Sequence, residues 1–596
     1  MEETLSSRCF SLMKSKEDTP KFVALAMLPS ILSKTPLCAI DYWKALDFQW
    51  IDRLLKAGPE ESSCEKEQDI YMEYRTLALN ILLSFASFPE LSQDRNMIER
   101  IPSLVSILRE NDFSSLSSIL DLLIILAQSD SGAFKILDYQ QAKTIFSCIE
   151  VSCDASSEKI VNLIKHAFIK SLASTSSIHH SKSSLKKCAK DMANILRQSK
   201  GKKRLIVFSF FNDVFSNIEV ESLNFLIKDT EVKKTLYDIL YTLIREDQSD
   251  STRKMTSSLL CSILRSQGID FILSCASSQE EARKFCVFFT NLTSVDIRSI
   301  LPTIMKKIIS KEISEEPQRL SIDYEILEFM IIYLSNSETI IFQPSELLLL
   351  QRSFEEAFEE SIDFLKDRWE NFKKNQNSSS ENIHFDIFND LITISSVRSL
   401  CLWLKEDENL RKYSSSIMDM FIYLWEKTNI YNIDYRLWIC NGLQGIITTK
   451  DGWNNFYSLG FWNIISTDLI KNDSETSNQY SICLGLSECE LLLQVIEKSK
   501  KSEENWVNII NHPKRIDKKD PLKAELSIRI IILSLIIFEK MEPLFLTQNQ
   551  KALSDHLEIS LMWIHFLNSR KLDCSWTIPI ELKDELIIHT EGLRSI

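Results

Sequence analysis

Glycine and proline are scarce in this chain, at 10 and 13 of 596 residues, whereas average usage is roughly 7% and 5%. β-Sandwiches and barrels need turn residues every ~8–12 positions. Nucleotide-binding α/β folds need a glycine-rich turn beneath the phosphate. The sequence lacks the glycines for either class on a large scale, and it contains neither a P-loop nor a G-x-G-x-x-G motif.

Positive charge is also in deficit, because 69 Lys and Arg stand against 83 Asp and Glu and the net charge is −14. Broad binding to a phosphate backbone needs dense Lys and Arg, so we expect no nucleic-acid partner. Hydrophobic residues make up 44% of the chain and charged residues 26%. This composition belongs to a folding chain rather than to a disordered one.

The fourteen cysteines include no C-x-x-C pair, and most stand within apolar runs. Such thiols behave as small hydrophobic groups, and scattered thiols without a secretion signal indicate a reducing compartment. The longest apolar run near the C-terminus, residues 530–538, is far shorter than the ~20 residues of a membrane span. We therefore expect reduced, mostly buried thiols in a cytosolic protein that could also enter the nucleus, with at most weak peripheral membrane contact.

Motifs for catalysis or metal binding are missing from the sequence. It contains no G-x-S-x-G, no H-E-x-x-H and no Cys/His cluster at zinc-finger spacing. The adjacent His179 and His180 lie in a Ser-rich stretch, and adjacent residues rarely reach one ion well. We predict a protein without enzymatic activity, metal or cofactor.

Amphipathic helical periodicity runs almost from end to end, including one helix over about residues 39–57. In the first third, a recurring apolar phrase closes on a small residue at Ala86, Ala127 and Ala173, which are 41 and 46 positions apart. HEAT and armadillo repeats have periods of about 40–47 residues. Helices this apolar need neighbours to cover them. The sequence therefore predicts an all-α fold, an armadillo/HEAT-like α-solenoid of stacked helix pairs.

A polar segment over residues 373–383 is the best candidate for a boundary. We predict an N-terminal armadillo-like solenoid over residues 1–372 and a helical continuation of it over 384–596. The helix before the boundary carries an apolar stripe formed by Phe354, Phe358, Ile362, Leu365, Trp369 and Phe372. Its start remains open between Pro344 and a capping box of Ser353 and Glu356.

Two basic clusters and one acidic cluster could receive partners. Residues 200–204 (KGKKR) resemble a nuclear-import or anion patch, but we favour a helix end with Gly201 after the last turn and cations near its carbonyls. Residues 512–521 form a longer basic loop, which is either solvated or a site for an anionic partner. Its cations are the candidate partner-binding residues, Lys514, Arg515, Lys518 and Lys519.

The acidic cluster lies opposite the aromatic stripe and comprises Glu355, Glu356, Glu359 and Glu360. Such a run most often forms a solvated helix face, with partner binding as the alternative.

Several segments, taken in order, resemble the neurochondrin family. They are residues 9–25 (CFSLMKSKEDTPKFVAL), 46–55 (LDFQWIDRLL), 88–91 (FPEL), 97–102 (MIERIP), 397–407 (VRSLCLWLKED) and 451–461 (DGWNNFYSLGF). The resemblance runs in register to about residue 500, and its motifs are structural rather than catalytic. Animal members carry paired N-terminal cysteines for lipidation, whereas Cys9 here stands alone within the first helix.

The resemblance implies an armadillo-like α-solenoid without known catalysis that regulates signalling in the cytosol. In animals the family is linked to neurite outgrowth, to restraint of calmodulin-dependent kinase and to membrane receptors. We therefore predict a scaffold or adaptor that binds protein partners through its helical surface. The alternative is a karyopherin-like transport or assembly-chaperone factor, which would carry basic cargo on an acidic inner face.

Overall fold

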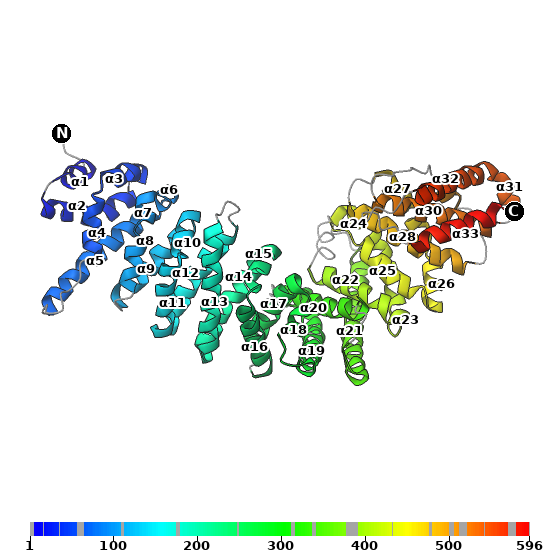
Figure 1. Ribbon diagram of the computed structural model, residues 1–596, viewed down its shortest axis with the longest axis horizontal. Helices are drawn as coiled ribbons and strands as arrows, with labels where there is room; N and C mark the ends of the chain where they lie inside the picture. The colour runs from blue at the N-terminus through cyan, green and yellow to red at the C-terminus, as the bar shows by residue number, and fades with distance from the viewer. Residues whose placement is uncertain are drawn as a thin grey trace. The chain divides into compact units, whose positions relative to one another are not determined.

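The computed structural model is built from helices (Figure 1). It describes residues 5–15, 17–34, 36–56, 65–108, 113–173, 179–246, 249–310, 316–336, 341–376, 391–431, 433–475, 479–499, 506–511, 521–541, 543–569 and 580–594. Helices contain 90% of these residues, and no strand occurs among them. The predicted all-α class is confirmed.

The chain forms two compact units, residues 1–286 and 287–596. The division falls within α19 (Gln279–Ser310). The predicted boundary segment, 373–383, lies inside the second unit, and most of it is outside the described residues. The division predicted there stays a prediction.

Unit 1 contains two rows of helices in which each member packs on the next member of its row (Figure 1). The first row is α4 (Phe48–Lys56), α8 (Ile101–Leu108), α11 (Tyr139–Val151), α13 (His179–Gln198) and α16 (Thr230–Glu246). The second row is α2 (Asp18–Lys34), α5 (Glu65–Ala86), α9 (Phe113–Leu126), α12 (Asp154–Ala173), α14 (Gly201–Asn217) and α17 (Asp250–Gln267). Consecutive helices of the two rows also pack together, so apolar faces are covered along both directions.

Short helices precede several of these pairs and complete three-helix repeats of the armadillo type. They are α6 (Pro89–Ser92), α7 (Arg95–Ile98), α10 (Asp130–Ile136), α15 (Val220–Ile227) and α18 (Asp270–Cys275). The N-terminal end adds α1 (Leu5–Met13), η1 (Pro36–Cys38) and α3 (Ala39–Ala45). The three recurring apolar phrases of the sequence form the ends of α5, α9 and α12, which stack in turn. The predicted repeat in this third of the chain is therefore confirmed.

Polar contacts between neighbouring repeats join residues that lie one repeat period apart. Lys159 Nζ donates to Ser117 Oγ at 2.8 Å, 42 positions away. Lys233 Nζ donates to Ser274 Oγ at 2.7 Å, 41 positions away. These separations match the spacing of the apolar phrases, so the same period sets both the core and the surface.

Unit 2 continues the pattern with a row in which each helix again packs on the next. This row is α20 (Glu316–Asn336), α22 (Leu391–Glu406), α25 (Arg436–Ile446), α28 (Gln479–Lys498), α30 (Pro521–Lys540) and α33 (Ile580–Arg594). Further helices pack beside it: α21 (Pro344–Gln376), α24 (Met418–Tyr431), α27 (Phe461–Glu475) and α32 (Gln550–Ser569). The short elements are α23 (Arg411–Ser414), η2 (Ser415–Ile417), α26 (Lys450–Ser458), α29 (Val507–Asn511) and α31 (Pro543–Gln548).

The aromatic stripe of α21 is buried, as the sequence predicts. Phe354 packs on Trp403 of α22 with ring centroids 4.8 Å apart. Trp369 Nε1 donates to Asp419 of α24 at 2.7 Å. The helix begins at Pro344, which settles the open question of its start, and the Glu346 carboxylate accepts from the Gln343 N–H just before it at 2.8 Å.

The prediction of one continuous helix over residues 39–57 is wrong. The chain forms α3 and α4 with a break at Leu46 and Asp47. Asp47 accepts from the Trp50 N–H at 3.2 Å and from Lys21 Nζ at 2.9 Å. The carboxylate thus caps a new helix, which a count of apolar residues alone does not reveal.

Candidate protein-interaction surfaces

The candidate basic loop cannot be placed on the fold, because Lys514, Arg515, Lys518 and Lys519 lie outside the described residues. The chain enters it from α29 and leaves it into α30. The role assigned to the four cations stays a prediction.

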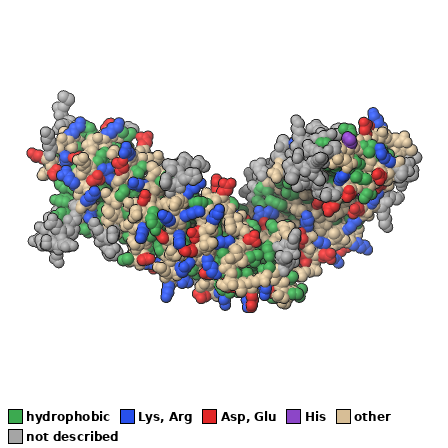
Figure 2. Space-filling view, in the orientation of Figure 1, with side chains coloured by type: hydrophobic (Ala, Val, Ile, Leu, Met, Phe, Trp, Pro, Cys, Tyr) green, Lys and Arg blue, Asp and Glu red, His purple; other side chains and the backbone are tan. Residues whose placement is uncertain are grey.

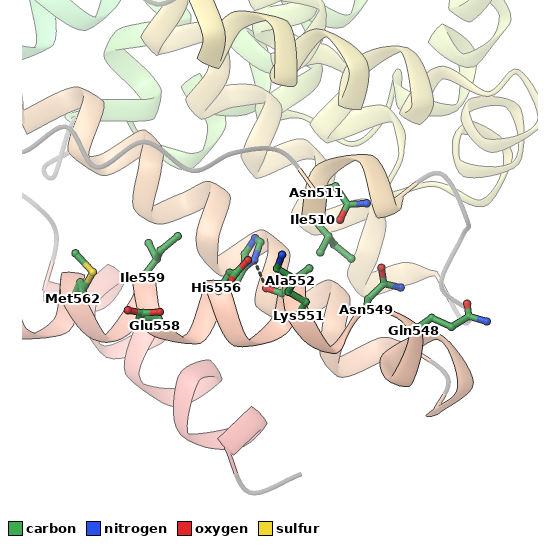
Figure 3. Close-up of a pocket in the computed structure, with 11 residues that line it drawn as sticks. Ile510, Asn511, Gln548, Asn549, Lys551, Ala552, His556, Glu558, Ile559 and Met562 are labelled. Atoms are coloured by element: carbon green, nitrogen blue, oxygen red, sulfur yellow. Dashed lines mark hydrogen bonds between the residues drawn. The ribbon is translucent and has the colours of Figure 1, made fainter.

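A cleft of about 690 Å³ lies between α29 and the segment formed by α31 and α32 (Figure 3). Of these helices, α29 immediately precedes the basic loop in sequence. Ile510 and Asn511 of α29 line one side. Exposed Lys551, Asp555 and Glu558 of α32 line the other. The cleft thus presents charged and amide side chains from neighbouring helices.

His556 is the one imidazole that lines this cleft among the described residues, and its contacts are structural. Its Nδ1 lies 2.7 Å from the carbonyl oxygen of Ala552, one turn back in α32. Its ring meets Phe538 of α30 edge-on, with centroids 5.6 Å apart. In the described part of the chain, no three His, Cys, Asp or Glu side chains come together as a metal site would require. The imidazole is therefore held by its own helix and by α30.

The strongest basic surface of the described chain lies in unit 1. Residues 139–217, which form α11 to α14, contain 13 Lys and Arg but 5 Asp and Glu. Figure 2 shows Lys and Arg side chains gathered over α11–α16. The short motif KGKKR marks only residues 200–204 of this surface, whereas a charge count over a longer window identifies all of it.

Three lysines in the first half of α13 form the centre of this surface, which we term the α13 lysine cluster: Lys182, Lys186 and Lys187. The ammonium groups of Lys182 and Lys186 lie 6.0 and 4.6 Å from the centroid of the Phe225 ring of α15. Lys187 Nζ lies 5.3 Å from the centroid of Tyr139 of α11. Across the part of the chain that the structure describes, none of the three forms an ion pair with a carboxylate.

Lys190, one turn further along α13, behaves differently. Its Nζ lies 2.8 Å from Glu231 Oε2 of α16, and this hydrogen bond raises the pKa of the lysine although burial opposes it. The same helix thus carries both a lysine neutralised within the fold and three that are not.

The 200–204 cluster lies at a helix end, as predicted, but the position predicted for Gly201, after the last turn of a helix, is wrong. Gly201 has φ +54° and begins α14. Lys203 Nζ donates to the carbonyls of Glu150 and Ser152 at 3.0 and 3.1 Å, where α11 ends. The cation therefore does meet terminal carbonyls, but those of a helix in the preceding repeat.

The acidic cluster of α21 joins helices within unit 2. Glu356 forms ion pairs with Arg298 of α19 and, at 2.9 Å, with Arg352. Glu355 accepts a hydrogen bond from Asn409. Burial, together with the nearby Asp363 charge, raises the pKa of Glu360. Only Glu359 of the four is exposed, so the simple solvated face that the sequence favours is an incomplete description.

Rows of helices that pack in order, with contacts repeated about 40 residues apart, define an α-solenoid of the armadillo/HEAT class. The sequence model of the neurochondrin family matches residues 2–432. The chain belongs to the neurochondrin family, as the resemblance implied.

Two relatives have sequences similar to this chain over long stretches. An uncharacterised protein of Schizosaccharomyces pombe is 25% identical over 482 residues, which are 80% of this chain and 78% of that protein. The neurochondrin homolog of Drosophila melanogaster is 23% identical over 372 residues, which are 60% of this chain and 48% of that protein.

Solved structures show only distant similarity. A chain from a structure of the interaction between cadherin and β-catenin has a TM-score of 0.49 at 8% identity, covering 98% of both chains. A crystal structure of importin β has a TM-score of 0.36 at 11% identity, covering 99% of this chain and 76% of that one. Scores of this size assign no partner and no site to the chain.

Family and fold together suggest a helical protein-interaction scaffold, and such proteins are typically non-enzymatic. Within the described ranges, no helix combines the length and the apolar character that crossing a bilayer requires.

Proposed function

We propose that the chain is a non-enzymatic adaptor of the cytosol that binds protein partners on the exposed faces of its stacked helices and thereby regulates signalling. The α13 lysine cluster is the observation that carries this proposal. It is a charged surface, held over aromatic rings, that forms no ion pair with a carboxylate of the described residues. The twelve described cysteines are free and mostly buried, which fits a reducing compartment.

The karyopherin-like alternative needs an acidic row of helices to receive basic cargo. Unit 1 contains 36 Lys and Arg against 37 Asp and Glu, whereas unit 2 contains 33 against 46. The acidic excess thus belongs to unit 2, where Glu356 of α21 already pairs with Arg298 of α19 and Glu355 accepts from Asn409. Unit 1 instead offers a basic surface, which favours the adaptor.

Partner capture by the full-length chain tests the adaptor function. The tagged chain, expressed at its natural level, is cross-linked in cells and purified beside an untagged control. We expect a saturable set of proteins, including signalling proteins, whose cross-links fall on exposed helix faces. Recovery of no protein above the control would contradict the adaptor function. Recovery of basic cargo proteins cross-linked to unit 2 would favour the transport alternative.

A further inference from the structure

We propose that the α13 lysine cluster binds a short Asp/Glu-rich segment of a partner protein. This inference rests on the proposed adaptor function and names the chemistry of the partner. The ligand is a segment with several carboxylates that lies along α13, between α11 and α15.

Lys182 and Lys186 do not stabilise the helix that carries them. Lys182, Lys186 and Lys190 follow one another at i, i+4 and i+8, and like charges at this spacing destabilise a helix. Lys182 and Lys186 also lie in the first half of α13, whereas cations stabilise the C-terminal end of a helix. Glu231 neutralises Lys190 within the fold, whereas no carboxylate of the described residues forms an ion pair with Lys182, Lys186 or Lys187. An external anion would relieve the repulsion.

The surroundings of the cluster fix the positions of its charges. Phe225 and Tyr139 come from the short helix and the first-row helix of two different repeats, and their rings hold the ammonium groups on either side of α13. A peptide lying across the cluster would therefore meet ammonium groups at fixed positions and not flexible lysine side chains. Lys143, exposed one turn after Tyr139 in α11, extends the positive surface toward the preceding repeat.

The charges that border the cluster limit the length of the ligand. Asp191 lies beside Tyr139 and raises the pKa of its phenol, together with burial. Glu231 and Asp229 stand at the other edge, at the start of α16. A long polyanion such as nucleic acid makes 6–10 phosphate contacts along a continuous strip, on the order of what known repressors use, and would meet these carboxylates. A segment with three or four carboxylates avoids them.

Fluorescence anisotropy with the full-length chain tests the proposal. The probe is a labelled eight-residue peptide of alternating Glu and Ser, which carries four side-chain carboxylates, and the comparison peptide has Gln in place of Glu. The test variants are Lys182→Glu/Lys186→Glu/Lys187→Glu and the milder Lys182→Gln/Lys186→Gln/Lys187→Gln. The matched control, Lys34→Glu/Lys44→Glu/Lys56→Glu, reverses three exposed lysines of the same unit. Circular dichroism verifies that each variant folds.

We expect the Glu peptide to bind and the Gln peptide not to bind. Both cluster variants should weaken binding by about tenfold or more, while the control changes it less than about twofold. Equal loss in the control and the cluster variants would overturn the proposal, as would absence of binding by the wild-type chain. So would equally tight, cluster-dependent binding of a twelve-nucleotide RNA or of vesicles containing phosphatidylserine. If partners are captured in cells but do not depend on the cluster, only this inference fails; if none is captured, the adaptor function fails with it.

Discussion

The carbonyl oxygen of Leu126 lies so close to Gly132 that a Cβ at Gly132 would stand 2.1 Å from it. Ser129, between them, donates from its hydroxyl to that carbonyl at 2.9 Å and accepts from the Gly132 N–H at 3.1 Å. The chain therefore turns from α9 into α10 in a space that only glycine fits.

The same arrangement recurs in unit 2 between α25 and α26. A Cβ at Gly452 would stand 2.2 Å from the Ile446 oxygen. Thr449 donates to that oxygen at 2.9 Å and accepts from the Gly452 N–H at 3.1 Å. Two units thus use one turn to connect successive repeats, although glycine is rare in the chain.

We predict that Gly132→Ala and Gly452→Ala each destabilise the fold by about 1–3 kcal/mol, because a buried methyl group forced against backbone costs about that much. Thermal denaturation followed by circular dichroism measures the loss. Faster hydrogen exchange in peptides covering α10 or α26 should accompany it.

Gly592 provides the control for these substitutions. It lies in α33, and an added Cβ would meet only Glu539 Oε1 at 3.4 Å. Gly592→Ala should be neutral or stabilising by about 0.5–1 kcal/mol, since alanine favours a helix. Equal destabilisation by all three substitutions would contradict the role assigned to the turn.

Lysines recur as caps of helix ends one repeat away. Besides Lys203, Lys540 Nζ donates to Ile496 O at 2.6 Å and Lys498 Nζ donates to Ile447 O at 2.7 Å. We predict that Lys203→Met costs about 0.5–1.5 kcal/mol, the net worth of such hydrogen bonds. The neighbouring exposed lysine gives the matched comparison: Lys202→Met should change the denaturation midpoint little. Identical denaturation midpoints for Lys203→Met and Lys202→Met would contradict the capping role of Lys203.

The thiols should divide sharply in reactivity. Burial raises the pKa of both Cys188 and Cys286 to about 12, whereas hydrogen bonds from Ser156 lower the pKa of the exposed Cys153. At pH 7.5, Cys153 should react with iodoacetamide far faster than the other two, and urea should abolish the difference. Mass spectrometry of timed samples provides the rates, and rapid native labelling of Cys286 would contradict the buried core.

Asp47 should make the stability of unit 1 depend on pH. The hydrogen bond from Lys21, aided by the Trp50 N–H and opposed by burial, lowers its pKa below the ordinary 3.8. The folded chain then binds fewer protons than the unfolded chain, so the stabilisation is present above pH 3.8 and is lost as pH falls through the lowered pKa.

Two variants of Asp47 separate its charge from its cap. Asp47→Asn keeps the cap and should cost about 0–1 kcal/mol near neutral pH, the range of a partly exposed ion pair. Its free energy of unfolding should equal that of the wild type at a pH where the Asp47 carboxyl is protonated. Asp47→Ala should cost about 1 kcal/mol more at every pH, because the cap is lost as well. Urea denaturation between pH 3 and 7 measures both, and a constant gap between Asp47→Asn and the wild type would exclude the charge effect.

The sequence predicts the stacking of this protein well, because periodicity and composition are local properties. The apolar phrases ending at Ala86, Ala127 and Ala173 identify α5, α9 and α12 correctly. Eight of the twelve described cysteines are buried, and all twelve are free, in agreement with the prediction for the thiols that the structure describes. The break at Asp47 is missed because the apolar pattern is helical on both sides of it, and only the hydrogen bond from the Trp50 N–H to the Asp47 carboxylate shows that a new helix begins there.

The candidate surfaces are harder to predict, because they depend on side chains that meet across repeats. Nothing in the sequence pairs Lys186 with Phe225, 39 positions away, or Lys203 with the carbonyl of Ser152. Glu356 is a further example: its sequence context predicts a solvated side chain, but in the fold it pairs with Arg298 of α19. Charge counts locate a basic region, but only the fold separates lysines that cap helices from those that face solvent.

Hydrogen exchange of the full-length chain, with and without a co-purified partner, tests the central claim most directly. We expect protection in segments of neighbouring helices that lie about 40 residues apart, such as α11, α13 and α16, since a partner on stacked helices covers successive repeats. Protection confined to the cleft between α29 and α32, or no protection in any helix, would contradict binding through the stacked surface.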